Sequence, residues 1–97
     1  MVLEVADIQV TPGAEEEFLA AYRGIRDVLV TTPGCNSVRM TRGIESPARF
    51  TLLVEWDSVE AHERNFRAGD GFVRWRAAIG PHFARPPQVG HYVDIDG

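Results

Sequence analysis

Three histidines, one cysteine and ten arginines are the side chains of this 97-residue sequence best suited to acid–base or ionic chemistry. Of these, His62 has the most informative neighbours. It follows Val59 by three residues and precedes Phe66 by four, so one face of a helix would carry all three and aim His62 at a core or a pocket. Because an unperturbed imidazole titrates near pH 6.5, a pocket-facing His62 would exchange protons with a substrate. A hydrogen-bonded core histidine is the alternative.

The other candidate residues offer less. His82 and His91 are too far apart in sequence to form a short metal-binding pair, so we expect surface or interface histidines. Cys35 is the single cysteine, which excludes an internal disulfide and favours a small buried apolar side chain. The sequence contains no glycine-rich phosphate loop, nucleophile elbow or Cys/His metal spacing. It therefore predicts no metal, flavin or nicotinamide cofactor.

The first third of the chain predicts a strand and then an amphipathic helix. Residues 2–10 alternate between two apolar faces, one of which carries Leu3 and Val5. Residues 11–13 (Thr-Pro-Gly) are typical of a helix start capped by the threonine, with the acidic residues 15–17 near the positive end of the helix dipole. One apolar stripe then recurs with helical spacing at Phe18, Tyr22, Ile25 and Leu29.

The rest of the chain predicts a hairpin, a second helix and a last strand. Alternation over residues 36–44 and 49–56, with a turn between them, indicates the hairpin. A capping pattern at residues 57–60 predicts the second helix, which is broken near residues 69–71, and residues 89–95 predict the last strand. The order βαββαβ is typical of a ferredoxin-like α+β fold, a four-stranded antiparallel sheet with both helices on one face.

Length and charge narrow the class of protein. Residues 1–97 form one domain, because two cores would each be too small to offset the conformational entropy lost on folding. The net charge of −4 and the scattered arginines make nucleic acid an unlikely partner. No apolar run is long enough to span a bilayer, and no signal pattern opens the chain. We expect a cytoplasmic protein.

The second face of the sheet predicts a partner subunit. Leu3, Val5 and Leu53 project away from the helices if their strand neighbours face them. A chain of this length has no spare element to cover that face, and small domains gain stability by association. The sequence therefore predicts a homodimer in which two sheets pack together.

The residues at the turns and element boundaries of the chain are similar in type and spacing to those of one known family. Over most of its length the sequence resembles the antibiotic biosynthesis monooxygenase family through Pro12-Gly13 before Glu15-Glu16-Glu17-Phe18, through Pro33-Gly34-Cys35, and through Phe50-x-Leu52-x-x-x-Trp56-x-Ser58-x-x-Ala61. The resemblance implies a dimeric α+β barrel with a pocket between the sheet and helices of each subunit. Function varies widely within such folds.

The stretch from Trp56 to Ala68 is most similar to the cofactor-free, anthrone-oxidising members. In those members a tryptophan, a helix-borne tyrosine, an arginine and a strand-borne asparagine line the pocket. The resemblance carries these positions to Trp56, His62, Arg76 and Leu52 respectively. Two positions match, one is altered to histidine and the asparagine is lost. The register of Arg76 can shift by one because of the break near residues 69–71.

The resemblance also implies roles for these residues. His62 would take a proton from the substrate, Arg76 would stabilise the resulting anion, and Trp56 would stack on a flat ring. Trp56 as a core residue and Arg76 as a solvated or paired side chain are the alternatives. We expect further substrate contacts from Asn65, Phe66 and Tyr22. For Asn65 the alternative is a hydrogen bond to local backbone, and for Tyr22 it is a place in the core with its hydroxyl at the pocket edge.

The resemblance therefore predicts a cofactor-independent monooxygenase that uses O₂ on an aromatic, polyketide-like anthrone or quinol. A non-catalytic dimer that binds a small aromatic ligand is the alternative from another class. Haem degradation is less favoured, because the positions of that branch's strand-borne asparagine, helix-borne tryptophan and iron-ligating histidine hold Ala6, Asn65, and Trp75 or Arg76. An iron ligand from elsewhere, His82 or His91, is the alternative.

Overall fold

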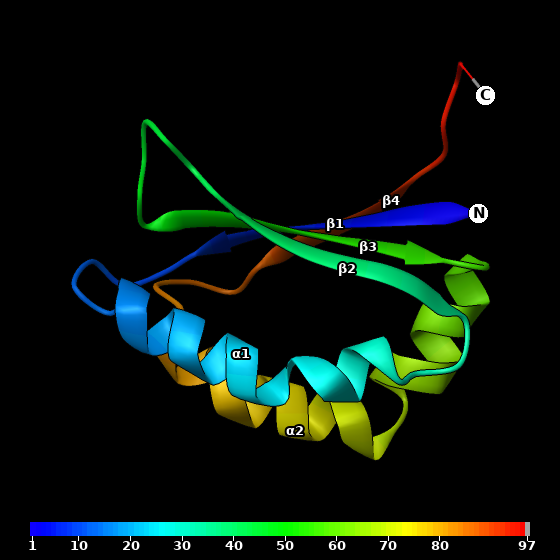
Figure 1. Cartoon of the computed structure of the whole chain (residues 1–97), viewed down its shortest axis with the longest axis horizontal. Helices are drawn as coiled ribbons and strands as arrows, with labels where there is room; N and C mark the ends of the chain where they lie inside the picture. Colours follow the sequence, from blue (N-terminus) through cyan, green and yellow to red (C-terminus); the bar gives the residue numbers. More distant parts are fainter. Residues whose placement is uncertain (97) are drawn as a thin grey trace.

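The computed structural model describes residues 1–96 and has the predicted element order (Figure 1). A single sheet lies over a layer of helices, and both termini lie at the same end of the sheet. The elements are β1 (Val2–Gln9), α1 (Glu15–Val30), β2 (Cys35–Arg42), β3 (Arg49–Trp56), the π-helix η1 (Ala61–Arg67), α2 (Asp70–Ile79), the 3₁₀ turn η2 (Gly80–His82) and β4 (Gln88–Tyr92). The ferredoxin-like α+β fold is confirmed.

The sheet has the strand order β2-β3-β1-β4, and every neighbouring pair is antiparallel. The first strand therefore lies between the third and the last. In the β1–β4 ladder Glu4 is paired with His91, and on its other side Glu4 is paired with Val54. Residues opposite each other in a ladder share a face of the sheet, so the pairing brings a carboxylate and an imidazole from opposite ends of the chain to the same place.

The helices cover one face of the sheet, and the core lies between the two layers. Alternate residues of β1 and β3 are buried there, as the period of two requires. The apolar stripe predicted for α1 is also present, with Ile25 at its partly buried edge. The largest fully buried side chains are Trp56, Phe18, Phe50, Ile8, Leu29, Ile79, Val10 and Val54.

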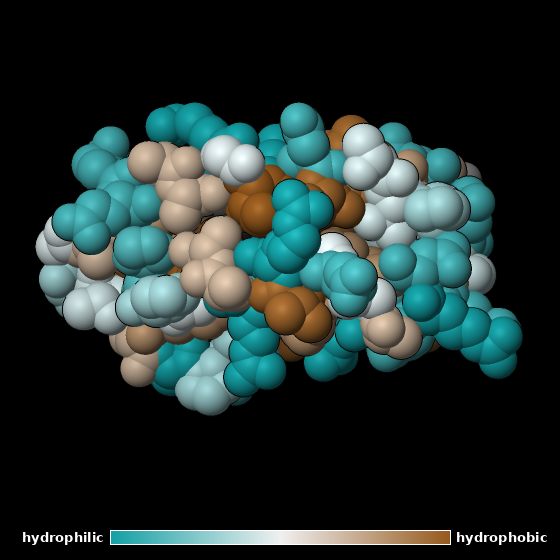
Figure 2. All heavy atoms as spheres, turned by 90° about the horizontal axis from the view of Figure 1, so that it is seen from below, coloured by the Kyte–Doolittle hydropathy of each residue, from teal (hydrophilic) through white to brown (hydrophobic). Residues whose placement is uncertain are grey.

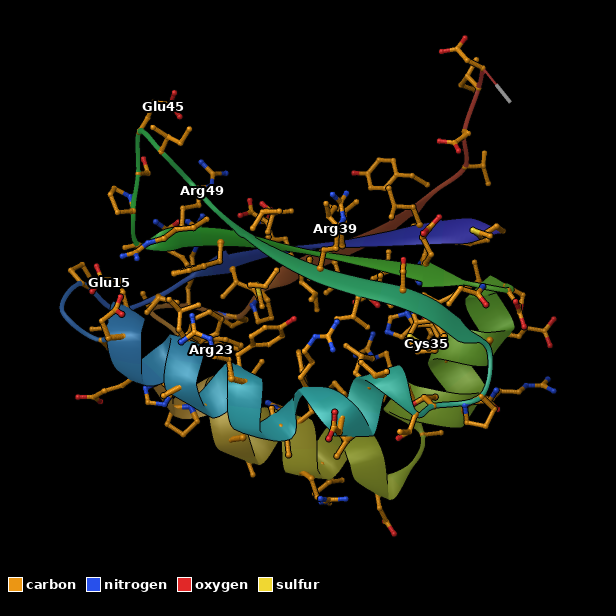
Figure 3. All side chains as sticks on the ribbon, in the orientation of Figure 1. Glu15, Arg23, Cys35, Arg39, Glu45 and Arg49 are labelled. Atoms are coloured by element: carbon orange, nitrogen blue, oxygen red, sulfur yellow. The ribbon has the colours of Figure 1, made fainter. Side chains whose placement is uncertain are left out.

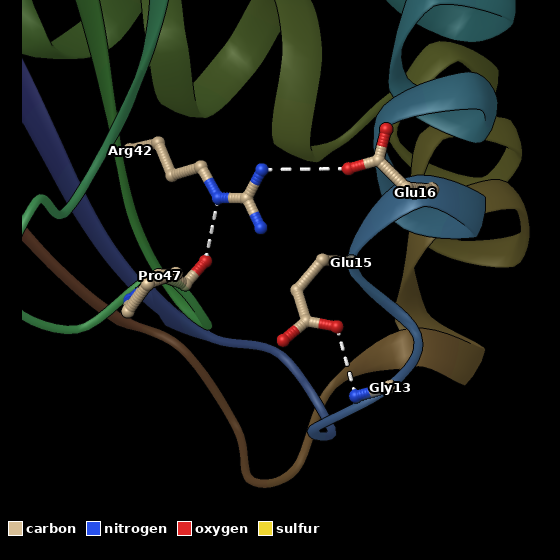
Figure 4. A network of polar contacts seen from close by, with 5 residues as sticks. All are labelled: Gly13, Glu15, Glu16, Arg42 and Pro47. Carbon is tan, nitrogen blue, oxygen red and sulfur yellow. Dashed lines mark hydrogen bonds and ion pairs between the residues drawn. The ribbon is translucent and has the colours of Figure 1, made fainter.

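The first helix begins later than predicted. It starts at Glu15, with Ala14 as its cap residue, rather than at Thr11. Residues 11–14 instead form a turn in which the Ala14 N–H donates to the Thr11 carbonyl (2.9 Å). The Glu15 carboxylate accepts from the Gly13 N–H (2.8 Å) and links this turn to the helix, but no side chain of residues 1–96 caps the helix as expected of the threonine (Figure 4). Gly13 takes φ +96°, which glycine adopts without strain.

The second helix is interrupted where predicted. Ser58 accepts a hydrogen bond from the Ala61 N–H (3.1 Å), which confirms the cap, and the helix then widens into the π-turn of residues 61–67. The bond from the Ala68 N–H to the Glu63 carbonyl spans five residues, as a π-helix requires. Gly69 is extended and separates this segment from α2.

Two predicted strands extend too far. β2 ends at Arg42, and Ile44, which we expected in the alternation, is 89% exposed in the β2–β3 connection beside Glu45 (Figure 3). β4 ends at Tyr92 rather than Ile95, which is 90% exposed. Both errors have one cause. Each segment continues past the strand it pairs with, and β-branched residues without a ladder partner do not form a strand.

The outer face of the sheet differs from the outer face of the helices. Seen from the helical side, hydrophobic side chains are broken up by hydrophilic ones (Figure 2). On the sheet, Leu3, Val5 and Leu53 face outward and are only half-buried within one subunit, as predicted. Within residues 1–96 no helix is long and apolar enough to cross a membrane.

Candidate active site

A cavity of about 760 Å³ lies between the sheet and the second half of the helical layer. Its volume suits a small aromatic molecule. The floor comes from β1 and β3, the walls from η1 and α2, and the mouth from the loop before β4. The lining residues are Glu4, Ala6, Ile8, Leu29, Leu52, His62, Phe66, Arg67, Phe72, Trp75, Arg76, Ile79, Gly80, Phe83, Arg85, Pro86, Pro87 and Val89.

Glu4 is the one acidic residue among those that line the cavity, and it is 6% exposed. Its Oε1 accepts a hydrogen bond from the indole N–H of Trp56 at 2.9 Å. Burial raises the pKa of Glu4, and the Trp56 hydrogen bond offsets part of that rise. The result is a carboxylate that is fixed in place and more basic than one in water.

His62 lies directly beside this carboxylate and is 3% exposed. Its Nε2 is 3.4 Å from Oε1 of Glu4, and its Nδ1 is 2.8 Å from Nε2 of His91. The imidazole also stacks on the Trp56 indole, with ring centroids 5.1 Å apart and planes 22° apart. Glu4, His62 and His91 thus form one chain of polar contacts, which we call the acid–imidazole chain.

The ionisation of His62 differs from the expected value near 6.5. Burial, and to a smaller extent the neighbouring His91, lower the pKa of His62 to about 4. Neutral His62 carries one proton, on Nε2 facing Glu4 or on Nδ1 facing His91. The contacts allow either tautomer, because His91 accepts in one case and donates in the other.

Contacts with the α1–β2 turn hold the π-helix and hence His62. Asn65 donates from Nδ2 to the Pro33 carbonyl at 2.8 Å. Gly34, at φ +91°, lies so close to the start of η1 that an added Cβ would be 2.6 Å from the Cβ of Ala61. Glycine is required there for both reasons. The turn after α1 therefore sets the position of a histidine far along the chain.

Three arginines give the wall and mouth of the cavity a positive charge. Arg67, Arg76 and Arg85 line it, and the guanidinium of Arg67 lies 5.3 Å from the centre of the Phe72 ring. Within residues 1–96 none of the three has a carboxylate within 4 Å. These cations are free to face an anionic group of a bound molecule.

Four of the predicted site residues line this cavity and three do not. The four are His62, Arg76, Leu52 and Phe66. Trp56 differs from the expectation because it is fully buried behind Glu4 and His62, so it positions them and does not stack on a bound ring. Tyr22 borders a different hollow, where its hydroxyl accepts from Arg26, and Asn65 bonds backbone.

The sequence reasoning missed Glu4 and misjudged His91. Glu4 lies on the strand face that carries Ala6 and Ile8, and an acidic residue on a buried face was a usable signal. His91, expected at the surface or an interface, is half-buried and bonded to His62. Its partner became apparent only when β4 paired with β1.

The comparisons with known proteins agree with the fold. The family model described as antibiotic biosynthesis monooxygenase matches residues 1–78, most of the chain. The chain belongs to the antibiotic biosynthesis monooxygenase family.

Several known proteins are similar over nearly the whole chain. A Bordetella bronchiseptica structure that carries the family's name superposes with a TM-score of 0.93 at 39% identity, covering 97% of this chain and 96% of the other. The uncharacterised YczJ of Bacillus subtilis is 28% identical over 98% of this chain and all of its own length. SnoaB of Streptomyces nogalater, a cofactor-independent oxygenase, superposes with a TM-score of 0.83 at 19% identity, covering 96% of this chain and 91% of its own, and shows the shared fold alone.

Haem, used by one branch of the antibiotic biosynthesis monooxygenase family, does not fit this cavity. Haem iron needs a protein ligand such as a free imidazole nitrogen. His62 is the cavity's histidine, and both of its nitrogens already face partners, His91 and Glu4. Trp75, at one place expected for the ligand, is buried against Tyr22 and Phe66.

Donor atoms of His62, Glu63 and His91 lie within 4.8 Å of one another and form the one such grouping in the described part of the chain. Two nitrogens bound to one tetrahedral ion are about 3.4 Å apart, given metal–nitrogen distances of about 2.1 Å. The 2.8 Å separation of the two imidazole nitrogens matches a hydrogen bond instead. Their arrangement is therefore accounted for by proton sharing.

Proposed function

We propose that this protein is a cofactor-independent oxygenase that oxidises an electron-rich aromatic substrate, an anthrone or quinol, with O₂. One observation carries the proposal: the acid–imidazole chain of Glu4, His62 and His91 opens into a cavity with unpaired arginines. This arrangement can remove a proton from a phenol or its keto form and hold the anion. The name of SnoaB, a cofactor-independent oxygenase on the same fold, supports this reaction class.

The chemistry needs no group beyond substrate and O₂. Loss of a C–H or O–H proton gives an aromatic enolate, and the enolate transfers an electron to O₂. The radical pair combines into a C–O bond, which gives a peroxide anion that takes up a proton. The hydroperoxide then loses water and leaves a carbonyl. In sum, an anthrone and O₂ become an anthraquinone and water, with the protein's proton acceptor restored.

The residues divide this work between them. The His62 side of the cavity receives the proton, and Arg76 faces the oxygen on which negative charge develops. Leu52 and Phe66 flank the ring of the substrate with apolar surface. A mostly apolar cavity also strengthens the attraction between the arginine and the anion.

Oxygen consumption by metal-free, flavin-free protein tests the proposal. We expect 1,8-dihydroxyanthrone to consume O₂ in the presence of the protein much faster than in buffer, with chelator making no difference. His62→Phe keeps the volume of the side chain and should lower turnover about a hundredfold or more. His82→Phe, a histidine outside the cavity lining, is the matched control.

Binding without oxygen consumption would contradict the proposal. The protein would then be a non-catalytic carrier or sensor of a small aromatic ligand. If the His62→Phe variant turned over as fast as the His82→Phe variant, the mechanism that assigns proton handling to His62 would be wrong.

We also propose that the working unit is a homodimer. The outward side chains of Leu3, Val5 and Leu53 need cover, and two such sheet faces are complementary by symmetry. Sedimentation of the purified protein should give twice the chain mass of 10.8 kDa. A monomer that persists at high concentration would contradict the dimeric barrel.

A further inference from the structure

We propose that Glu4 is the group that takes the proton from the bound substrate, and that His62 and His91 pass this proton from the cavity to the surface at β4. This inference rests on the proposed function for the identity of the substrate. It assigns proton abstraction to the Glu4 carboxylate and makes His62 the group that passes the proton from Glu4 to His91.

Glu4 has one oxygen free for a substrate. Its Oε1 already faces the Trp56 N–H at 2.9 Å and His62 Nε2 at 3.4 Å. Its Oε2 makes no hydrogen bond within residues 1–96. Because every fully buried side-chain oxygen in this part of the chain has a hydrogen-bond partner, Oε2 must be accessible. Since Glu4 lines the cavity, Oε2 is the acceptor that a substrate hydroxyl or acidic C–H can reach.

His62 is less suited to direct proton capture. Each of its ring nitrogens faces a protein partner, His91 on one side and Glu4 on the other. A substrate proton would have to displace one of those contacts. The same two contacts suit His62 to proton transfer, because one ring nitrogen can accept a proton while the other nitrogen donates one.

The transfer balances without a charged His62. The captured proton is on Oε2, so the carboxyl group of Glu4 first rotates to turn this O–H toward Nε2 of His62, into the position that Oε1 holds at 3.4 Å. Nε2 then takes the proton as the proton on Nδ1 of His62 moves to Nε2 of His91. Glu4 is left ionised, His62 stays neutral, and His91 becomes an imidazolium. His91 is half-buried on the edge strand β4 and releases its extra proton to water.

The direction of the pKa shifts supports these roles. Burial raises the pKa of Glu4, which makes it a stronger base. The pKa of about 4 for His62 makes a stable imidazolium there costly, so His62 transmits a proton and does not store it.

Neighbouring groups modify the acid–imidazole chain from each side. On η1, Glu63 favours a proton on both Glu4 and His62, whereas Arg67 disfavours it. On β2, burial and then Glu4 raise the pKa of Cys35, so its thiol stays neutral near Glu4. From α2, Arg76 lines the same cavity and favours the anion of the substrate.

The role of Glu4 can be tested without any oxidation. The stable dye 1,8-dihydroxyanthraquinone changes its visible absorption on ionisation, so under nitrogen it reports whether a bound phenol loses its proton. Below the pH at which the free dye ionises, the wild-type protein should bind it as the anion. Glu4→Gln keeps an acceptor for the Trp56 N–H and should slow ionisation of the bound dye at least tenfold.

Glu60→Gln is the matched control, since it removes an exposed carboxylate that precedes η1 and lies outside the cavity lining, and it should leave the rate of dye ionisation unchanged. Thermal melting of both variants checks that they fold. Normal dye ionisation by a folded Glu4→Gln protein would overturn the assignment of Glu4. Because the dye cannot be oxidised, this outcome is independent of whether the protein proves to be an oxygenase.

The role of His91 has a kinetic signature. His91→Ala should slow ionisation of the bound dye roughly tenfold in a stopped-flow measurement, while the final ionised fraction stays near the wild-type value. Added imidazole buffer should restore the rate of this variant in proportion to its concentration and leave the wild-type rate unchanged. An unchanged rate, or a slow rate that imidazole does not restore, would overturn the relay through His91.

Discussion

Two hollows of this molecule are lined by arginines, but they differ in what lies at their base. The cavity over β1 and β4 has a buried carboxylate and a buried imidazole beneath its arginines. The second hollow, about 490 Å³ between α1 and β2, contains no acidic or imidazole side chain. Figure 3 labels Arg23 of this second hollow.

Two of the four arginines that line the second hollow are also held by other protein groups. In the second hollow Arg26 donates to the Val38 carbonyl and the Tyr22 hydroxyl, and Arg42 donates to the Pro47 carbonyl and Glu16 (Figure 4). These cations stabilise the fold. Within the described residues the cavity's arginines form no ion pair. Positive charge alone therefore does not distinguish a candidate site, whereas a buried acid–base cluster next to unpaired charge does.

Removing one arginine from each hollow is the strongest test of this difference. We expect Arg76→Ala to lower oxygenase turnover on the order of a hundredfold or more, because an anion in a low-dielectric cavity loses its cation. Arg23→Ala, in the second hollow, should leave turnover unchanged. Initial rates of oxygen uptake with 1,8-dihydroxyanthrone provide the measurement. Equal effects of the two substitutions would remove the distinction between the hollows.

The pH dependence of stability should also originate in the cavity. The unfolded chain binds a proton at His62 below pH 6.5, whereas in the folded protein the pKa of His62 is about 4. The free energy of unfolding should therefore fall as the pH drops from about 6.5 to about 4, by about 3 kcal/mol, since each pKa unit corresponds to about 1.4 kcal/mol.

Glu4 acts in the opposite direction at the acid end of this range. Its raised pKa costs stability where the unfolded chain is ionised, and protonation of the folded protein recovers part of it. Urea unfolding at several pH values, with wild-type protein and His62→Phe, measures the effect. The variant should lose most of the slope between pH 6.5 and 4, and a slope equal to that of wild type would refute the assignment to His62.

Removing a hydrogen-bonding group from an aromatic side chain beside each hollow should lower the free energy of unfolding by different amounts. Trp56→Phe removes the N–H that holds the Glu4 carboxylate and should lower the free energy of unfolding by about 1 to 3 kcal/mol. Tyr22→Phe removes only a 3.3 Å acceptor of Arg26, which keeps its bond to the Val38 carbonyl, so we expect less than about 1 kcal/mol. Similar losses in urea unfolding would show that the buried carboxylate does not depend on Trp56.

The smallest effect should come from an ion pair outside both hollows. Arg49 donates to both carboxylate oxygens of Asp7 and lowers the pKa of Asp7, but both side chains are partly solvated. Exposed pairs are worth up to about 1 kcal/mol and are screened by salt. Arg49→Gln should change the urea midpoint only slightly, and less at high salt. A larger loss would mean that this pair is part of a tighter network than its exposure suggests.

Local patterns in the sequence predicted the elements and their order. The alternation of β1 and β3, the apolar stripe of α1 and the break near Gly69 all appear in the structure. The ends of β2 and β4 were wrong because a strand ends where its ladder partner ends, and no local pattern contains that information.

The residues of the candidate site were also predicted only in part. The helical spacing around His62 predicted a side chain that points inward, and His62 does line the cavity. The expected role of Trp56 did not account for the imidazole that covers its face, because that contact joins β3 to a π-turn. A helix of ordinary pitch would have placed the later residues of η1 differently.

The sequence by itself determined that this chain forms a βαββαβ sheet-and-helix domain with a histidine on the inner face of its second helix, because period and punctuation are local properties. Only the tertiary structure decided which groups share protons there. Glu4, His62 and His91 lie on three elements separated by most of the chain. They meet because β4 pairs with β1 and because His62 of η1 contacts a residue of each strand, and the pKa shifts of Glu4 and His62 follow mainly from their burial there.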